Sequence, residues 1–385
     1  MSKNISLSIP SLQGNEWKYI KECLDTEWVS SAGKYVDLFE EKIAEYTGSS
    51  YAISCVNGTS ALQLALRLVG VDPGDEVIVP TLTFIAPINA VAYNNASPIF
   101  MDADEYYNID SAKTIEFINK ETVFKDGTTF NKRTNRKIKA IVPVHVFGNA
   151  TLLDELIPLC EERNICVVED ASESMGTRYS KHRFSGKHTG TIGRMGCLSF
   201  NGNKIITSGG GGMIITDDGH LANKAHYLNT QAKDDPMRYI HNEIGYNFRL
   251  TNIQAAMGVA QLEQLPAFLG LKKRIHQQYV NGLDNILGVE IAKVPDYAEN
   301  NHWMIPIQIN KEIKGSDLES VMANLAEEGI ESRPVWYPNH LQKPYKNCQT
   351  YKIEKALELV EKTLNIPCSV NLREEQVYTI VKCLE

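Results

Sequence analysis

Between residue 35 and about residue 230, short apolar runs alternate with segments in which apolar residues recur at helical spacing. Spacings of three and four residues in segments such as 59–69 and 152–163 predict helices. The apolar runs show little polar alternation, which is typical of strands that are covered on both faces. This pattern predicts a largely parallel sheet between helices, with strands at 51–56, 76–80, 98–101, 140–146, 165–169, 196–200 and 213–216.

After about residue 245 the pattern changes. Two helical stretches, 252–265 and 267–283, are separated by Pro266, a residue that removes a helical hydrogen bond. The remaining chain predicts strands at 303–309 and 330–335, and helices at 316–328, 351–364 and 374–384. We therefore expect an α/β protein with a large domain at 1–250 and a smaller α+β domain at 251–385.

Composition and charge narrow the class of protein. The 385 residues are 43% hydrophobic and 22% charged, as in an ordinary globular protein. Lys and Arg number 39 against 47 Asp and Glu, a net charge of −8 that argues against nucleic acid or an anionic membrane as partner. The sequence lacks an apolar run of the roughly 18 residues that a membrane span needs, and it does not begin like a secretion signal. We expect a cytoplasmic protein, and its 8 cysteines, which form no C-x-x-C pair, to be reduced core residues.

A lysine leaves the end of the apolar run 196–200 and precedes four consecutive glycines at 209–212. Such a glycine run indicates a backbone that approaches another group closely or adopts positive φ. A P-loop would need Gly-Lys-Ser or Gly-Lys-Thr, which this sequence lacks, and in a dinucleotide-binding turn the glycines would open a helix instead of preceding a strand. The pattern therefore favours Lys204 as an amine in a tight, partly dry pocket, a setting that suits Schiff-base chemistry.

Further strand ends carry groups suited to the same site. Asp170 ends the apolar run 165–169, at the edge where α/β sheets build their sites. A carboxylate there fits either a metal ligand or the partner of a protonated pyridine nitrogen. Phe84 follows the strand at 76–80 and is either a core aromatic or a face on which a flat ring stacks.

The segment 56–62 reads as a strand, a turn of small residues and a helix that opens with hydroxyl side chains. Free N–H groups at a helix start, together with such hydroxyls, form a phosphate cradle, although an ordinary capped helix has the same pattern. Beside a lysine and a strand-end acid, we favour the cradle, with candidate contacts from Gly58, Thr59 and Ser60.

The order and spacing of these motifs resemble the fold-type I, pyridoxal-phosphate-dependent sugar aminotransferases of the DegT/DnrJ/EryC1/StrS family. The resemblance extends from Gly33 to Leu364. It depends on the motifs N-G-T-S-A-L at 57–62, P-T-L-T-F at 80–84, P-V-H-V-F-G at 143–148, E-D-A-S-E at 169–173, S-F at 199–200 with Lys204, G-Y-N-F-R at 245–249, Q-A-A-M-G at 254–258 and R-P at 333–334.

The resemblance implies a role for each matching residue. Lys204 would form the Schiff base with pyridoxal 5'-phosphate and act as the catalytic base, with pyridoxamine 5'-phosphate as the intermediate form of the cofactor. Asp170 would face the ring nitrogen and Phe84 would stack on the ring. Asn247 would reach the phosphate of the neighbouring subunit's cofactor, which implies a homodimer with shared active sites. The phosphate contacts within the subunit would come from Gly58, Thr59, Ser60 and Ser199.

One residue departs from the family pattern. Many members carry Gln where this chain has Glu173, and Gln can donate a hydrogen bond to the cofactor's ring oxygen, whereas an ionised Glu cannot. Glu173 is therefore either protonated beside the cofactor or serves the substrate. Glu173 and the motif N-G-N-K at 201–204 resemble most the branch of the family that acts on 4-keto-6-deoxy N-acetyl sugars, of the legionaminic acid or bacillosamine type.

Candidates for substrate binding are His145, Arg249 and His340. His145 is more simply explained as a structural histidine, while His340 remains open between the two roles. Neither histidine has metal-ligand spacing to a second histidine or cysteine, and we expect no metal.

The resemblance implies transfer of an amino group from L-glutamate to a nucleotide-linked 4-keto-6-deoxy sugar in surface-glycan biosynthesis. It leaves open whether the nucleotide is UDP, GDP or dTDP. A pyridoxamine-dependent sugar dehydratase is a second possibility, although those proteins carry His at the position of Lys204. A metal-dependent nucleotide-sugar transferase, suggested by the D-x-D at 102–104, and a regulatory relative without catalysis are further alternatives.

The segment 125–139 carries six basic side chains and one acid. It is either a phosphate or nucleotide contact or a solvated, mobile hairpin or loop, and we favour the latter.

Overall fold

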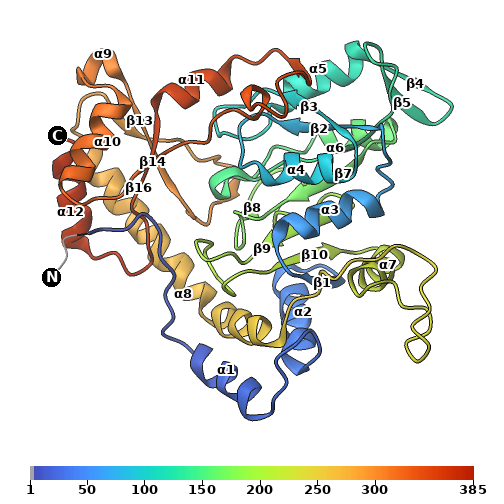
Figure 1. The fold of residues 1–385 in the computed structure, drawn as a ribbon. Coiled ribbons are helices and arrows are strands. Elements are labelled where there is room, and N and C mark those ends of the chain that lie inside the picture. Colours follow the sequence, from blue (N-terminus) through green and yellow to red (C-terminus); the bar gives the residue numbers. More distant parts are fainter. Residues whose placement is uncertain (1–3) are drawn as a thin grey trace.

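The computed structural model describes residues 4–385, and its centre is an eight-stranded sheet (Figure 1). All neighbours from β9 to β15 pair in parallel, whereas β10 runs antiparallel to both β1 and β9. The predicted, largely parallel sheet is therefore confirmed. Its order is β1 (Tyr51–Cys55), β10 (Gly212–Thr216), β9 (Met195–Ser199), β7 (Cys166–Asp170), β6 (Ile138–Ile141), β2 (Glu76–Pro80), β3 (Ser97–Met101) and β15 (Gln349–Tyr351).

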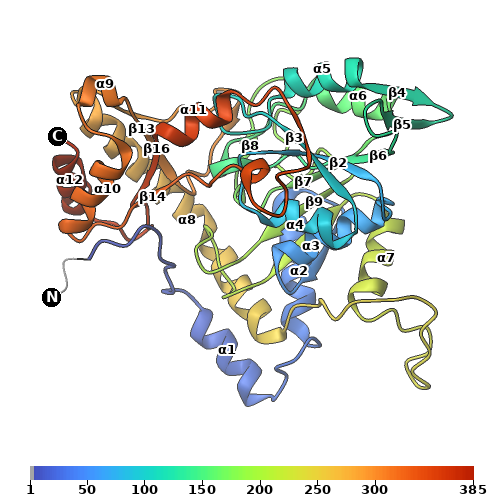
Figure 2. The same ribbon diagram turned by 45° about the horizontal axis from the view of Figure 1, so that its top comes forward.

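Helices cover both faces of this sheet (Figures 1 and 2). Successive side chains of a strand point to opposite faces, so Val77 and Val79 of β2 enter one buried cluster and Ile78 enters another. The first cluster also contains residues of α3 (Gly58–Leu68), α4 (Ala86–Tyr93) and α7 (Gly219–Asn229). The second contains residues of α5 (Ser111–Glu121) and α6 (Leu156–Glu162). The central strands are mostly apolar because helices cover both faces of the sheet.

The C-terminal part forms a second, antiparallel sheet with the order β11 (Val289–Ile291), β13 (Ile305–Ile309), β16 (Thr363–Ile366) and β14 (Arg333–Pro334). The helices of this part are α9 (Lys311–Lys314), α10 (Leu318–Glu327), α11 (Lys355–Lys362) and α12 (Glu374–Cys383). The strand β15 from this half of the chain joins the large sheet beside β3. The domain boundary at residue 250 stays a prediction.

The long helix α8 (Asn252–Leu283) corrects the predicted break at Pro266, because the helix continues through this residue. A capping box of Thr251 and Gln254 starts the helix, and its sides pack against α1 (Glu16–Asp25), α2 (Lys34–Thr47) and α12. Buried side chains on both sides of the proline, Leu262 and Phe268, join the same core. This burial outweighs the hydrogen bond that the proline removes.

The boundaries of several other predicted elements differ from the structure. The predicted helix 351–364 is a shorter helix, α11, and Leu364 lies in β16 instead. The predicted strand 140–146 ends at Ile141, the predicted helix at 152–163 begins only at Leu156, and the predicted strand 330–335 keeps only its last part as β14. For α11 the cause is a long-range contact that periodicity does not report, because Asp102 accepts hydrogen bonds from the backbone N–H groups at the start of this helix.

The basic segment begins in a β-hairpin of β4 (Thr122–Lys125) and β5 (Thr128–Asn131), which projects from the edge of the molecule (Figure 1). Asp126 and Gly127 form its turn with positive φ, as two-residue hairpin turns require. The structure thus has a hairpin at the start of this region, and a phosphate contact by the segment stays untested. Within residues 4–385, no helix combines the length and the apolar character needed to cross a membrane.

Candidate active site

A cavity of about 320 Å³ opens at the carboxyl ends of β7 and β9, beside the start of α3. Because these strands are parallel neighbours, their carboxyl ends meet at one edge of the sheet. The cavity collects residues from strand ends and a helix start that the sequence singled out separately. The predicted site residues that line it are Gly58, Thr59, Phe84, Asp170, Glu173, Ser199 and Lys204.

The glycine run after Lys204 lets two loops of the site come together. Phe200 N donates to Gly211 O at 2.9 Å, so the loop that carries Lys204 closes on itself. Gly211 has a φ of +110°, a conformation that disfavours other residues. A Cβ on Gly212 would lie 2.5 Å from the carbonyl carbon of Asn57, which precedes α3. The glycines therefore allow the lysine loop to lie directly against the turn that starts α3.

The Lys204 amine lies in a confined polar and aromatic environment. Its Nζ is 3.8 Å from Glu173 Oε1 and 4.1 Å from the centre of the Trp303 ring, and its side chain is 13% exposed. Trp303 Nε1 donates to Asn203 O at 2.7 Å, which fixes the indole next to the lysine loop. The indole thus covers the amine on one side.

Glu173 is buried, and its surroundings bring the pKa of its carboxyl close to neutral pH. Burial raises the pKa of the Glu173 carboxyl to about 7, against the opposing effects of the Lys204 charge and a backbone N–H. That N–H is on Phe147 and donates to Glu173 Oε2 at 2.8 Å. Glu173 can therefore hold a proton near neutral pH beside the lysine.

Asp170 ends β7 inside the cavity. Its Oδ1 accepts a hydrogen bond from Ser172 N at 3.0 Å. Burial raises the pKa of the Asp170 carboxyl, while the hydrogen bonds from Ser172 and the charge of Lys204 oppose the rise. A buried carboxylate of this kind gains a strong partner when a cationic group enters the cavity.

His145 does not reach the cavity, and the structure supports its structural role instead of the candidate role in substrate binding. The side chain is fully buried, with Nδ1 accepting from Thr151 N at 3.0 Å and Nε2 bonded to Glu169 Oε2 at 2.9 Å. Glu169 precedes Asp170 in β7, so its side chain points to the other face of the sheet. Both ring nitrogens of His145 are therefore used within the fold.

The start of α3 presents free N–H groups to the cavity. Asn57 caps the helix, with Oδ1 accepting from Ser60 N at 2.8 Å. Gly58 and Thr59 line the cavity, whereas Ser60 does not. A Cβ on Gly58 would lie 3.0 Å from the Ser199 Cβ, so a glycine allows the helix start and Ser199 to face one ligand. The Ser60 N–H therefore contributes to the cap, and a contact between Ser60 and the cofactor stays a prediction.

Three other predicted residues lie outside the cavity lining. Asn247 is exposed. Arg249 Nη2 pairs with Asp37 Oδ1 at 3.2 Å, and His340 Nδ1 shares a hydrogen bond with Thr81 Oγ1 at 2.6 Å. Within this subunit, His340 therefore holds a strand end and does not face the ligand space.

The model of the DegT/DnrJ/EryC1/StrS aminotransferase family matches residues 10–385. The chain belongs to this family. A protein named GDP-perosamine synthase from Caulobacter vibrioides is 38% identical over 384 residues, which cover 99% of this chain and 97% of that protein. A protein named putative pyridoxal phosphate-dependent aminotransferase EpsN from Bacillus subtilis is 36% identical over 391 residues, which cover 100% of this chain and 96% of that protein.

The crystal structure of a DegT DnrJ EryC1 StrS aminotransferase from Brucella abortus has the same fold, with a TM-score of 0.84 and 27% identity. The match covers 96% of this chain and 94% of that chain. The predicted family, its fold-type I α/β architecture and the aminotransferase class are therefore confirmed. The branch acting on 4-keto-6-deoxy N-acetyl sugars stays a prediction.

Sequence reasoning missed several residues of this family member's cavity. Asn57, Ser172, Asn201 and Asn203 lie next to residues that it named, so adjacency was an available signal. Trp303 and Trp336 come from the C-terminal part, where no motif marks them as neighbours of Lys204.

The D-x-D at 102–104 has a structural role in this aminotransferase. The Asp102 side chain is fully buried and accepts from the backbone N–H groups of Glu354, Lys355 and Ala356, with Lys113 Nζ at 2.6 Å. Asp102 thus starts α11 and ties it to β3. Because both Asp102 oxygens accept these hydrogen bonds, the D-x-D motif no longer supports the alternative of a metal-dependent transferase.

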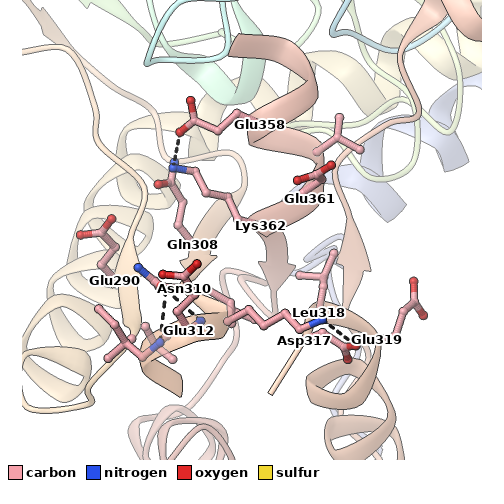
Figure 3. Close-up of a pocket in the computed structure, with 16 residues that line it drawn as sticks. Glu290, Gln308, Asn310, Glu312, Asp317, Leu318, Glu319, Glu358, Glu361 and Lys362 are labelled. Carbon is pink, nitrogen blue, oxygen red and sulfur yellow. Dashed lines mark hydrogen bonds and ion pairs between the residues drawn. The ribbon is translucent and has the colours of Figure 1, made fainter. Parts of the chain in front are cut away.

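A larger cavity of about 790 Å³ lies in the C-terminal part, and its lining includes acidic side chains from β11, α9, α10 and α11 beside apolar and basic ones (Figure 3). Glu358 pairs with Lys355 and Lys362, and Asp317 caps α10 at Ser320 N. No predicted site residue is among the residues that line this cavity. Its size alone therefore does not mark it as the active site.

Glu173 leads to a prediction about pH and stability. The folded protein without cofactor keeps the Glu173 proton up to about pH 7, whereas the unfolded chain releases it near 4.5. A raised carboxyl pKa means that stability falls as pH rises through this window, by about 3 kcal/mol. Glu173→Gln removes this titration. Urea unfolding at about pH 5 and about pH 8 should show the wild type losing stability relative to the Gln variant, and parallel curves would contradict the assignment.

Proposed function

We propose that this chain is a cytoplasmic, pyridoxal-phosphate-dependent aminotransferase that moves an amino group from L-glutamate to a nucleotide-linked 4-keto-6-deoxy sugar in surface-glycan biosynthesis. The observation that carries the proposal is one cavity that holds the Lys204 amine, the Asp170 carboxyl and the start of α3. These are an amine, an acid and an anion cradle, placed at one edge of the sheet.

The lining fits pyridoxal 5'-phosphate. The N–H groups of Gly58 and Thr59 and the Ser199 hydroxyl suit a phosphate at the start of α3. Phe84 lines the cavity yet is 53% exposed, so it offers an open aromatic face to the cofactor ring. Asp170 suits the ring nitrogen, and Lys204 Nζ suits the aldehyde carbon.

When bound, the cofactor would supply an electron-poor ring that stabilises negative charge beside the amine, and its pyridoxamine 5'-phosphate form would hold the amino group between the two half-reactions. Lys204 Nζ would take the proton from the Cα of the donor and deliver it to the C4′ carbon of the cofactor in the glutamate half, and would move a proton from C4′ to the sugar carbon in the other half. The Asp170 carboxylate keeps the ring nitrogen protonated, because the two opposite charges stabilise each other in a buried site. Trp303 covers one side of the amine and would limit the access of water to it.

One observation supports a sugar acceptor, and a second supports transamination as the reaction. The most similar relative described above is named GDP-perosamine synthase, and perosamine is a 4-amino-4,6-dideoxy sugar. Transamination that yields such a sugar starts from a 4-keto-6-deoxy sugar. The presence of Lys204 in the cavity favours the aminotransferase over the dehydratase, in which His replaces this lysine.

The test is a panel of UDP-, GDP- and dTDP-linked 4-keto-6-deoxy sugars offered to the purified protein with L-glutamate. We expect 2-oxoglutarate to appear with at least one of them, together with the amino sugar. A yellow protein that L-glutamate bleaches, but that aminates none of these sugars, would contradict the acceptor class and leave the cofactor assignment standing.

We further propose a homodimer with shared active sites, in which Asn247 reaches the cofactor phosphate of the neighbouring subunit. The segment after α7 projects away from the sheet in both views and is exposed, as Asn247 itself is (Figures 1 and 2). Large apolar side chains lie exposed on this segment and around α1, as expected of surfaces that a second copy covers. They are Trp17, Leu24, Trp28, Met237, Ile240 and Ile244.

Complementation tests the sharing. Lys204→Ala and Asn247→Asp are each expected to be inactive, because the first lacks the amine and the second places a carboxylate beside the phosphate. In a mixed dimer, the Lys204 of one subunit meets the Asn247 of the other, so one site of the two is intact. Co-expression should therefore restore about a quarter of wild-type activity. Activity equal to the sum of the separate variants would show that sites are not shared.

A further inference from the structure

Trp336 forms a wall of the cavity that no motif predicted. The side chain is half-buried and lines the cavity, and its ring is stacked on Phe147 with centroids 4.9 Å apart and planes at 22°. Phe147 N in turn donates to Glu173 Oε2 at 2.8 Å, and Glu173 lies beside Lys204. Trp336 is therefore held on the side of the cavity where the amine reacts.

The segment that carries Trp336 is fastened to the strand end that carries Phe84. Asn339 is 1% exposed, and its Nδ2 donates to Thr83 O at 2.8 Å and to Thr81 O at 3.2 Å. Asn339 N donates to Thr81 O at 2.8 Å, and the His340 ring shares its 2.6 Å hydrogen bond with the Thr81 hydroxyl. These hydrogen bonds therefore fix the position of the Trp336 segment relative to the Phe84 segment, although the two are far apart in the sequence.

We infer that Trp336 is a specificity-determining residue that contacts the acceptor sugar, and that Asn339 positions it; this inference rests on the proposed function. A 6-deoxy sugar presents a methyl group and C–H faces, which pack well on an indole. L-glutamate carries two carboxylates and a short apolar chain, for which an indole offers no charge partner. Trp336 therefore contributes more to the sugar half of the cycle than to the glutamate half.

The experiment compares the two half-reactions of the cofactor-loaded protein. The probes are L-glutamate and, for the reverse sugar half, three nucleotide amino sugars: GDP-perosamine, UDP-4-amino-4,6-dideoxy-N-acetylglucosamine and dTDP-4-amino-4,6-dideoxyglucose. Trp336→Leu should raise the KM for the amino sugar by about tenfold or more and change the glutamate half by less than about twofold. Equal losses in both halves would overturn the inference.

A binding measurement gives a readout that does not depend on catalysis. Calorimetry of the cofactor-free protein should show Trp336→Leu weakening the binding of the same amino sugar by about tenfold or more. The matched control is Tyr337→Leu, because Tyr337 is the next aromatic residue, is 57% exposed and does not line the cavity. Equal affinity in Trp336→Leu and Tyr337→Leu would overturn the inference.

Asn339→Asp tests the positioning, since it removes both Nδ2 donors at nearly constant size. We expect a raised KM for the amino sugar with the glutamate half unchanged, whereas a general loss of both halves would overturn the positioning role. Should this variant fail to fold, Thr81→Val removes only the hydroxyl partner of His340 and is expected to act in the same direction.

The wild-type protein separates a failure of this inference from a failure of the proposed function. If it reacts with L-glutamate but binds none of the three sugars, the proposed acceptor class is wrong. If it binds one of them, the comparison of Trp336→Leu with the wild type on that sugar decides the role of Trp336.

Discussion

The Lys204→Ala variant is expected to lose transamination by about 10³-fold or more and to lose the yellow colour of the loaded protein. Among the described residues, Lys204 is the one lysine that lines the cavity, so no second amine takes over the proton transfer at the donor Cα. Rates of both half-reactions, followed by absorbance, and the cofactor content after dialysis measure the effect.

The control for this experiment is Lys187→Ala, which removes an exposed lysine that does not line the cavity. It should keep wild-type rates and colour. Transamination by Lys204→Ala at the wild-type rate would remove the basis of the proposed mechanism, whereas loss in both variants would indicate a general effect of the substitutions on folding.

The second large effect is expected for Asp170→Asn, which should lower kcat by about 10²-fold to 10⁴-fold with little change in stability. The amide keeps the shape of the side chain but carries no negative charge to hold a proton on the ring nitrogen. Because burial raises the pKa of Asp170 in the empty cavity, the carboxylate gains little there, and a neutral amide does not destabilise the fold.

Kinetics and thermal unfolding of the same preparation separate these two expectations. Asp25→Asn serves as the control, since Asp25 is exposed and pairs with Lys21 along α1. A strong drop in the unfolding temperature of Asp170→Asn would mean that the lost activity reflects structure. Wild-type kcat would mean that Asp170 is not the partner of the ring nitrogen.

Local sequence patterns were sufficient for much of the fold. Seven of the eight strands of the large sheet overlap predicted apolar runs, and β2 has the predicted bounds Glu76–Pro80. The strand β15 has no apolar run and was not predicted. Periodicity failed where partners lie far away. Pro266 lies within α8 because both of its neighbouring turns are buried, and α11 begins where Asp102 binds its first N–H groups.

The sequence also predicted part of the candidate site. Lys204, Asp170 and Phe84 each follow a predicted strand, so the sequence placed them at one sheet edge, where they line the cavity. His145 also follows a strand but turns to the opposite side, and only its contacts with Glu169 and Thr151 reveal this. A side chain's direction after a strand end depends on the loop, which periodicity does not describe.

The sequence by itself determined most of the elements, the order of the motifs and the residue types that an aminotransferase needs, because these depend on neighbours close along the chain. Only the tertiary structure decided which side chains share one space: it placed Trp303 over the lysine amine and tied Trp336 to the wall of Phe84 through Asn339. Those contacts join residues far apart in sequence, and packing of the whole chain, not local pattern, selects them.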